Sequence, residues 1–124
     1  MSSNGSILIE GGRVIYPSQG LDRVTNLLVE DGRIASYDAI STGHEDIVDA
    51  HGKIVAPGLI DMHVHLREPG REEDETILTG SRAAVAGCFT SIACIPNTEH
   101  PIDSQATVEF IQHQAARADQ CNVF

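Results

Sequence analysis

The hydrophobic positions of the first 56 residues fall into short apolar runs, each bounded by turn-forming residues. Apolar runs at residues 7–9 and 14–16 flank Gly11-Gly12, and this arrangement predicts a tight β-hairpin. No stretch before Pro57 has the spacing of hydrophobic positions that an amphipathic helix needs. We therefore expect a small all-β module over residues 1–56.

Two further strand pairs are expected in this module. Asp31-Gly32 is the strongest short hairpin signal in the chain, and it joins residues 26–30 to residues 33–37. Residues 47–49 and 53–56 lie on either side of a glycine-containing turn and predict a third short pair. Residues 1–5 are interpreted as a flexible lead-in.

After Pro57-Gly58 the pattern changes from hairpins to strands that alternate with helices. Residues 59–64 and 89–95 predict buried strands, and residues 121–124 predict the start of a third. Two helices are expected between them. The first is predicted to begin at the acidic residues 72–75, to continue with helical spacing through Val85 and to end at Gly87; the second is capped by Asp103-Ser104. This β-α-β-α-β order predicts a parallel sheet with right-handed crossovers.

The predicted sheet is incomplete as a domain. Two and a half strands cannot close a barrel or cover both faces of an open sheet. Either the missing strands come from another chain, or the chain is a fragment of a longer protein. We prefer the fragment, because a finished domain rarely ends on entering a buried strand.

The charge and residue composition exclude some classes of function. The formal net charge is −10 and the sequence pI is about 4.8, which argues against a basic surface that grips nucleic acid. No apolar run approaches the length of a membrane span, and the first residues lack the features of a signal peptide. Three cysteines without a CxxC pair fit a reducing compartment. A cytoplasmic protein with no membrane or nucleic-acid partner is expected.

Residues with candidate chemistry lie at the C-terminal end of the strand predicted at residues 59–64 and directly after it. His63, His65 and Arg67 alternate with other residues, so in an extended chain they share one face. Two neutral imidazoles suit a divalent metal, although two ligands fall short of the three that catalytic zinc sites use. The plainer alternative is that two histidines merely happen to sit in a strand. If a metal binds, more ligands must come from later strands.

Two further residues suit an anionic substrate. Arg67 is interpreted as a bidentate clamp on a substrate carboxylate, with a solvated loop charge paired to Glu68 or Glu72 as the alternative. Asn97 follows the second strand of this region, so it should reach the same edge of the sheet as the histidines. Its amide could bind the same carboxylate, or Asn97 is an ordinary turn residue.

These motifs resemble a known family. Residues 57–70, which read PGLIDMHVHLREPG, are similar to the signature of dihydroorotases within the amidohydrolase superfamily. Residues 83–91 and 95–98 resemble the next conserved block of that family. The match runs in order from residue 6 to residue 124.

The resemblance implies a (β/α)₈ TIM-type barrel of the metal-dependent hydrolase class, with a β-sandwich domain built from both chain ends. Residues 1–56 would be part of the sandwich, and residues 57–124 the first β/α units of the barrel. One or two zinc ions are implied at His63 and His65, with His65, Arg67 and Asn97 touching the substrate. The catalytic aspartate and remaining ligands would lie on later strands, so no catalytic residue is expected in this chain, which alone should be inactive.

The implied reaction is the reversible, zinc-dependent cyclisation of N-carbamoyl-L-aspartate to dihydroorotate in pyrimidine biosynthesis. Other cyclic amidases, of the allantoinase or dihydropyrimidinase type, keep the two histidines but typically lack the arginine, so Arg67 with residues 96–98 favours dihydroorotase. A non-catalytic, dihydroorotase-like scaffold subunit is a further alternative, which loss of the histidines would support. The partners implied are the small-molecule substrate and, as open alternatives, a second copy of the chain or an aspartate transcarbamoylase.

Overall fold

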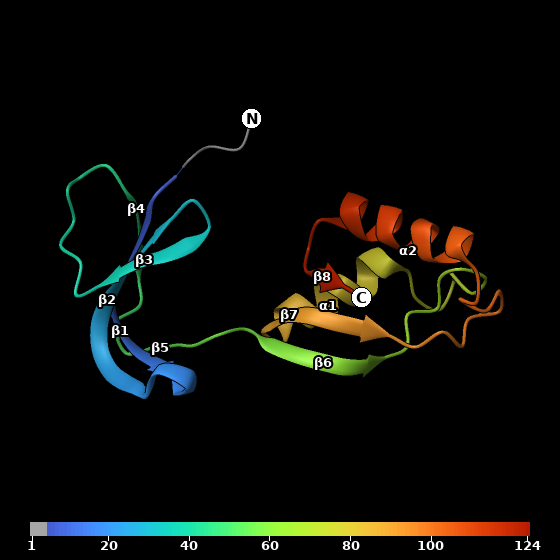
Figure 1. Cartoon of the computed structure of the whole chain (residues 1–124), viewed down its shortest axis with the longest axis horizontal. Coiled ribbons are helices and arrows are strands. Elements are labelled where there is room, and N and C mark those ends of the chain that lie inside the picture. The colour runs from blue at the N-terminus through green and yellow to red at the C-terminus, as the bar shows by residue number, and fades with distance from the viewer. Residues whose placement is uncertain (1–4) are drawn as a thin grey trace. The chain divides into compact units, whose positions relative to one another are not determined.

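The computed structural model describes residues 5–124, which form two compact units that divide between Pro57 and Gly58. Most of the expected lead-in, residues 1–4, lies outside the described residues. The first unit consists of β-strands and one short 3₁₀ helix, whereas the second alternates strands and helices (Figure 1). The two units thus differ in secondary structure, and the boundary between them lies at Pro57-Gly58.

The first unit is a five-stranded sheet built around a long central strand. Its strands are β1 (Ile7–Tyr16), β2 (Leu21–Glu30), β3 (Arg33–Tyr37), β4 (Asp46–Asp49) and β5 (Ile54–Val55), with the 3₁₀ helix η1 (Pro17–Gln19) between β1 and β2. The strand order is β3-β2-β1-β4, and β5 also pairs with β1. The core of this unit contains four buried apolar side chains: Leu8, Val14, Leu27 and Ala50.

The hairpin expected at Gly11-Gly12 is wrong, because β1 runs through both glycines as one strand. β1 pairs with β2 on both sides of a register shift between Ile9 and Gly12. Gly11 takes a left-handed φ of 67°, and its N–H donates to Asn26 Oδ1 at 3.0 Å. The extra residue is therefore absorbed as a β-bulge, which Asn26 on the partner strand stabilises. The two glycines bend the strand instead of reversing it.

The expected third pair is also wrong, although both of its strands exist. β4 and β5 do not pair with each other; each runs parallel to β1 and takes a different part of it. β4 pairs with residues 7–10 and β5 with residues 13–14, so one strand lies on each side of the bulge. The hairpin at Asp31-Gly32 is confirmed: β2 and β3 are antiparallel, and the two turn residues have φ of 50° and 71°.

The second unit confirms the predicted β-α-β-α-β order. Its elements are β6 (Leu59–Val64), α1 (Ile77–Ala86), β7 (Phe89–Cys94), α2 (Gln105–Ala118) and β8 (Asn122–Val123), and the sheet β6-β7-β8 is parallel throughout. One buried cluster joins both helices to the sheet: Leu66, Ile77 of α1, Ile92 of β7 and Ile111 of α2. Both helices therefore pack on the same face of the sheet (Figure 1).

Helix α1 begins later than the acidic run predicts. Thr76 is the N-cap: its hydroxyl accepts the Thr79 N–H at 3.1 Å, while the Thr79 hydroxyl accepts the Thr76 N–H at 2.9 Å. This reciprocal capping box places residues 72–75 before the helix, and no acidic residue lies in its first turn. Gly87 follows α1 and Ser104 caps α2, as expected. A hydroxyl cap thus decides the helix start, and the acidic residues form the preceding turn.

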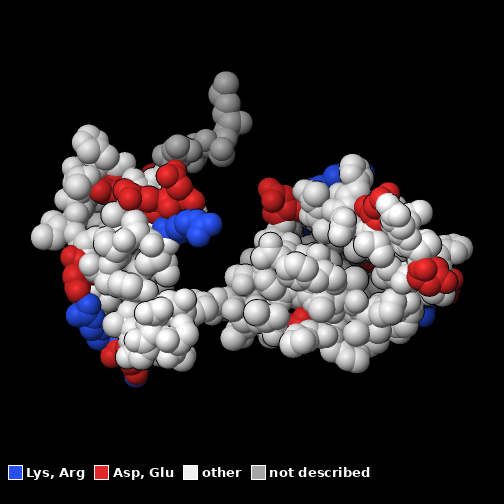
Figure 2. All heavy atoms as spheres, viewed as in Figure 1, with Lys and Arg blue, Asp and Glu red and all other residues white. Residues whose placement is uncertain are grey.

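Strand β6 is not buried as the sequence predicts. Three of its apolar side chains are exposed: Leu59 at 53%, Ile60 at 67% and Met62 at 79%. The reason is that β6 has a neighbour on one edge only and the two helices cover one face of the sheet. Figure 2 shows an uncharged surface over this part of the second unit, with the acidic residues nearer its margins. Parallel strands normally need cover on both faces.

Candidate metal centre

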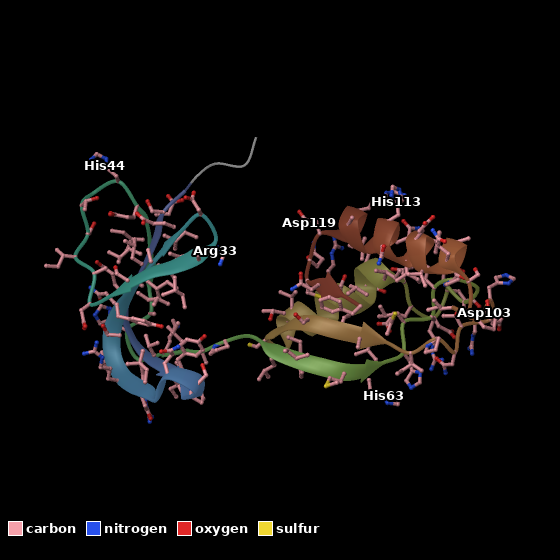
Figure 3. The ribbon with its side chains drawn as sticks, in the orientation of Figure 1. Arg33, His44, His63, Asp103, His113 and Asp119 are labelled. Carbon is pink, nitrogen blue, oxygen red and sulfur yellow. The ribbon has the colours of Figure 1, made fainter. Side chains whose placement is uncertain are left out.

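Burial alternates along the segment that leaves β6. Leu66 is 2% exposed and Glu68 is 8% exposed, whereas His63 is exposed and His65 and Arg67 are partly exposed. Leu66 belongs to the buried cluster between the sheet and the helices, so it orients the segment. Figure 3 shows His63 at the C-terminal end of β6, pointing away from α1 and α2. The alternation therefore turns His63, His65 and Arg67 away from the core, whereas Leu66 and Glu68 face it.

The two histidine rings lie close together. Their centroids are 5.1 Å apart and their planes are inclined by 63°. His65 Nδ1 lies 3.0 Å from Asn97 Oδ1. Because the amide oxygen can only accept, Nδ1 carries the proton and the lone pair is on Nε2. A ring held in this way is a ready metal ligand, since an oriented neutral imidazole is the form that binds a divalent ion.

Asp61 supports the other histidine through the backbone. Its Oδ1 accepts the His63 N–H at 3.0 Å, so the carboxylate is engaged with the main chain. This bond stabilises the strand end that carries His63. His63 therefore presents its ring to solvent from a fixed backbone position.

The donor set fits a metal only in part. Within residues 5–124 there is no group of three or more His, Cys, Asp or Glu side chains placed to hold an ion. The two imidazoles match the ligand chemistry of zinc, and they supply two of the three protein ligands of a typical catalytic site. The four other histidines are exposed; His113, for example, lies on the outer side of α2 (Figure 3). The residues present thus supply two of the ligands that such a site needs.

Arg67 forms no ion pair with any residue of the described chain. The carboxylates that the sequence offers as partners are engaged elsewhere. Glu72 accepts the Gly70 N–H at 2.9 Å, and this backbone bond lowers the pKa of Glu72. Glu68 is turned into the core. The Arg67 guanidinium is therefore left available for an anion.

Glu68 is the residue that reasoning from the sequence missed. Its Oε2 accepts the N–H of Ile77, the first residue of α1, at 2.8 Å, and its Oε1 accepts from Gln114 Nε2 of α2 at 2.9 Å. The signal was present in the alternation itself. A residue two positions after Leu66 lies on the same inward side, so a carboxylate there needs buried donors.

The loops after β6 and β7 lie against each other, which explains why His65 meets Asn97. A Cβ placed on Gly70 would be 2.7 Å from the Cβ of Glu99, so glycine is needed for this approach. Arg71 pairs with Asp74 in its own loop, and Arg71 Nε lies 3.9 Å from Glu99 Oε1 in the other loop. The C-terminal ends of adjacent parallel strands thus bring the two polar segments together.

The fold and the histidine pair define a class of protein. The chain is similar to the L-hydantoinase (dihydropyrimidinase) of Arthrobacter aurescens, with a TM-score of 0.72 and 26% identity over 88% of this chain and 24% of that one. It is similar in fold to molinate hydrolase, with a TM-score of 0.74 and 22% identity over 100% of this chain and 30% of that one. The architecture is that of the amidohydrolase TIM-barrel proteins.

The sequence narrows this class to a family. The model of the family described as dihydro-orotase-like matches residues 52–124, and the chain belongs to that family. The dihydroorotase of Trichlorobacter lovleyi is 52% identical over 122 residues, and that of Pelobacter propionicus is 54% identical over 121 residues. Each match covers 96% of this chain and 28% of the relative, so the chain spans about a quarter of their length.

The described part of the chain offers nothing to cross a bilayer as a helix. Neither α1 nor α2 combines the length and the apolar character that a membrane-spanning helix needs.

Proposed function

We propose that the full-length protein carrying this sequence is a dihydroorotase, which interconverts N-carbamoyl-L-aspartate and dihydroorotate in the cytoplasm. The observation that carries the proposal is the 52% identity with the Trichlorobacter lovleyi dihydroorotase over 122 residues. The alignment covers 96% of this chain and therefore reaches both units. It includes the segment that bears the histidine pair and Arg67.

In this proposal His63 and His65 hold zinc through their ring nitrogens. The hydrogen bond from His65 Nδ1 to Asn97 Oδ1 supports the assignment, because it leaves Nε2 as the ligand atom. Zinc bound there supplies a Lewis acid that polarises the amide carbonyl. The remaining ligands and the catalytic aspartate belong to later strands of the full-length protein.

Arg67 and Asn97 bind the substrate carboxylate. The guanidinium has a fork of donors that matches a carboxylate, and it has no ion-pair partner within residues 5–124. The Asn97 amide accepts from His65 with its oxygen, which leaves its nitrogen free to donate to the same anion. The Asn97 amide would thus both orient the metal-binding ring of His65 and bind the substrate.

We assign the two units to two different domains of the full-length protein. We propose that residues 57–124 are the first β/α units of a (β/α)₈ barrel. Residues 1–56 would form part of a composite β-sandwich domain. The parallel order β6-β7-β8, with both helices on one face, has the geometry of a barrel segment.

A cyclic amidase of the hydantoinase type is the second candidate. The observation that favours it is the 26% identity with the L-hydantoinase of Arthrobacter aurescens over most of this chain. The two functions differ in what Arg67 would do, since a substrate without a carboxylate gives the guanidinium nothing to bind. Dihydroorotate and dihydrouracil differ by that carboxylate and therefore discriminate between the candidates.

The test uses the full-length protein loaded with zinc and assays both substrates. We expect dihydroorotate to be turned over with a kcat/KM at least roughly 100-fold above that for dihydrouracil, since sites built to pair a substrate group reject analogues that lack it. Preference for dihydrouracil would establish the hydantoinase-type function instead. Absence of turnover with either substrate would favour the scaffold subunit.

A further inference from the structure

We propose that Glu68 is a positioning residue that holds the Arg67 guanidinium where the substrate carboxylate binds. This inference rests on the proposed function, because it deepens the role given there to Arg67. Glu68 itself faces the core and touches no substrate. It acts through the backbone on the C-terminal side of Arg67.

The carboxylate of Glu68 is a junction of three parts of the second unit. One oxygen accepts the first backbone N–H of α1 at 2.8 Å, and the other accepts from the side chain of Gln114, on α2, at 2.9 Å. The residue is 8% exposed; its bond to the Ile77 N–H is buried and its bond to Gln114 is partly buried. The segment after β6 is thereby tied to both helices at one point.

These two bonds suit a carboxylate. The first N–H groups of a helix have no partner within the helix, and the positive end of its dipole favours a negative charge. Glu68 supplies that negative charge from a segment outside α1, while Thr76, the residue directly before α1, caps the helix with its hydroxyl. Donors from α1 and α2 therefore meet a single carboxylate that can accept from both.

Arg67 lies between two fixed neighbours. Leu66 is 2% exposed and packs in the cluster with Ile77, Ile92 and Ile111, and Glu68 is held by its two hydrogen bonds. Both flanking side chains are buried, whereas the Arg67 side chain is partly exposed. Loss of the Glu68 anchor would free one end of this short span, while Leu66 would still hold the other.

The decisive experiment compares Glu68→Ala, Glu68→Gln and Glu73→Ala in the full-length zinc protein. In Glu68→Ala we expect the KM for dihydroorotate to rise roughly tenfold or more, with kcat within about threefold and zinc content unchanged, because a clamp on a remote carboxylate acts mainly on substrate binding. Glu73 is an exposed carboxylate of the same loop, so Glu73→Ala should leave both constants unchanged.

The Glu68→Gln variant distinguishes loss of the hydrogen bonds that position the segment from loss of side-chain volume. Glu68→Gln keeps the side chain's shape and one oxygen for the Ile77 N–H, and the Gln114 amide can turn to accept from the new amide nitrogen. The KM of Glu68→Gln should therefore lie within about threefold of wild type. A KM in Glu68→Ala equal to that of wild type would overturn the proposal, as would an equal fall of kcat and kcat/KM, the mark of a group that acts only in the transition state.

A second variant covers the case in which Glu68→Ala does not fold. Gln114→Leu removes the donor that α2 provides to Glu68. It should raise KM in the same direction by a few-fold, and an unchanged KM would overturn the proposal.

Hydrogen exchange gives a readout that does not depend on turnover. In Glu68→Ala the amides of residues 65–71 and of the first turn of α1 should exchange faster, and those of the first unit should not change. Wild type that fails to turn over dihydroorotate refutes the proposed function. Unchanged exchange in the variant refutes the Glu68 anchor, so the two failures are distinguishable.

Discussion

Arg67 shows how much of the candidate site depends on a single charged side chain. Among the described residues it has no ion-pair partner, although Glu68 and Glu72 are close in sequence. Both carboxylates accept from backbone N–H groups instead. A guanidinium that local carboxylates leave unpaired is suited to bind a ligand that is itself anionic.

Replacing Arg67 by alanine should weaken substrate use without loss of metal. A hydrogen bond to a charged group contributes about 1.5–3 kcal/mol, so kcat/KM for dihydroorotate should fall roughly 10- to 150-fold. Steady-state kinetics and zinc analysis of the full-length protein measure both effects. Arg82→Ala, at an exposed position of α1, is the control. Loss of zinc in the Arg67 variant, or normal kinetics, would exclude the assigned role.

A second residue-scale prediction concerns Glu45 in the first unit. Its pKa is lowered from 4.5 to about 2, chiefly by the hydrogen bond from the Thr42 hydroxyl, with backbone N–H groups and Ser41 adding to it. Because the folded pKa is depressed, the stabilisation is present above the unfolded value and is lost as the pH falls from about 4.5 towards 2. The difference in unfolding free energy between wild type and Glu45→Gln should therefore shrink over that range.

Denaturant unfolding at a series of pH values measures this difference. Above about pH 5.5 it should be constant, because Glu45 is then ionised in both folded and unfolded states. A difference that keeps the same size down to pH 2 would contradict the prediction.

At the scale of elements, local hydrogen bonds decide where each element starts. The acidic residues 72–75 have the composition of a first helical turn, yet the reciprocal bonds of Thr76 and Thr79 place the start of α1 after them. In the same way, Asn26 lets β1 pass through Gly11-Gly12 without turning. In both cases one side chain outweighs a compositional trend.

Substitution at the N-cap tests this account of α1. Thr76→Ala removes the hydroxyl that accepts the Thr79 N–H and should lower the free energy of unfolding by about 1 kcal/mol. Glu73→Ala should change it by less than about 0.5 kcal/mol, as for other exposed positions outside the helix. Thermal or urea unfolding measures both. A larger loss in the Glu73 variant would mean that the helix starts in the acidic run after all.

At the scale of the whole molecule, the described residues hold only part of the proposed catalytic centre. Residues 5–124 contain two neighbouring histidines and no third metal-ligating side chain beside them. The exposed apolar residues of β6 lie on a strand with one neighbour. Both observations agree with a chain that spans about 28% of the length of its curated relatives.

The 124-residue chain by itself should therefore show no measurable dihydroorotate turnover. Two imidazoles are too few to hold zinc as a catalytic site does, and the proposed acid–base aspartate is not among these residues. The measurement is turnover with and without added zinc, with the full-length protein as the positive control. Zinc-dependent turnover by the isolated chain would contradict this prediction.

The sequence by itself determined those features that depend on interactions between residues close together along the chain. The Asp31-Gly32 turn, the Ser104 cap and the β-α-β-α-β order follow from backbone preferences and hydrophobic period, and the structure contains them. The contact between His65 and Asn97 was also within reach, because adjacent parallel strands end at the same edge of a sheet.

Only the tertiary structure decided which strands pair with each other and which groups form hydrogen bonds with the polar side chains. The pairing of β4 and β5 with β1 depends on a bend in a distant strand. The burial of Glu68 depends on donors from α1 and α2, the second of them 46 positions away along the chain. Hydrogen-bond partners that are remote in sequence leave no local sequence pattern. The sequence therefore indicated His63, His65 and Arg67 as candidate site residues. The role of Glu68 as a buried anchor became visible only in the folded structure.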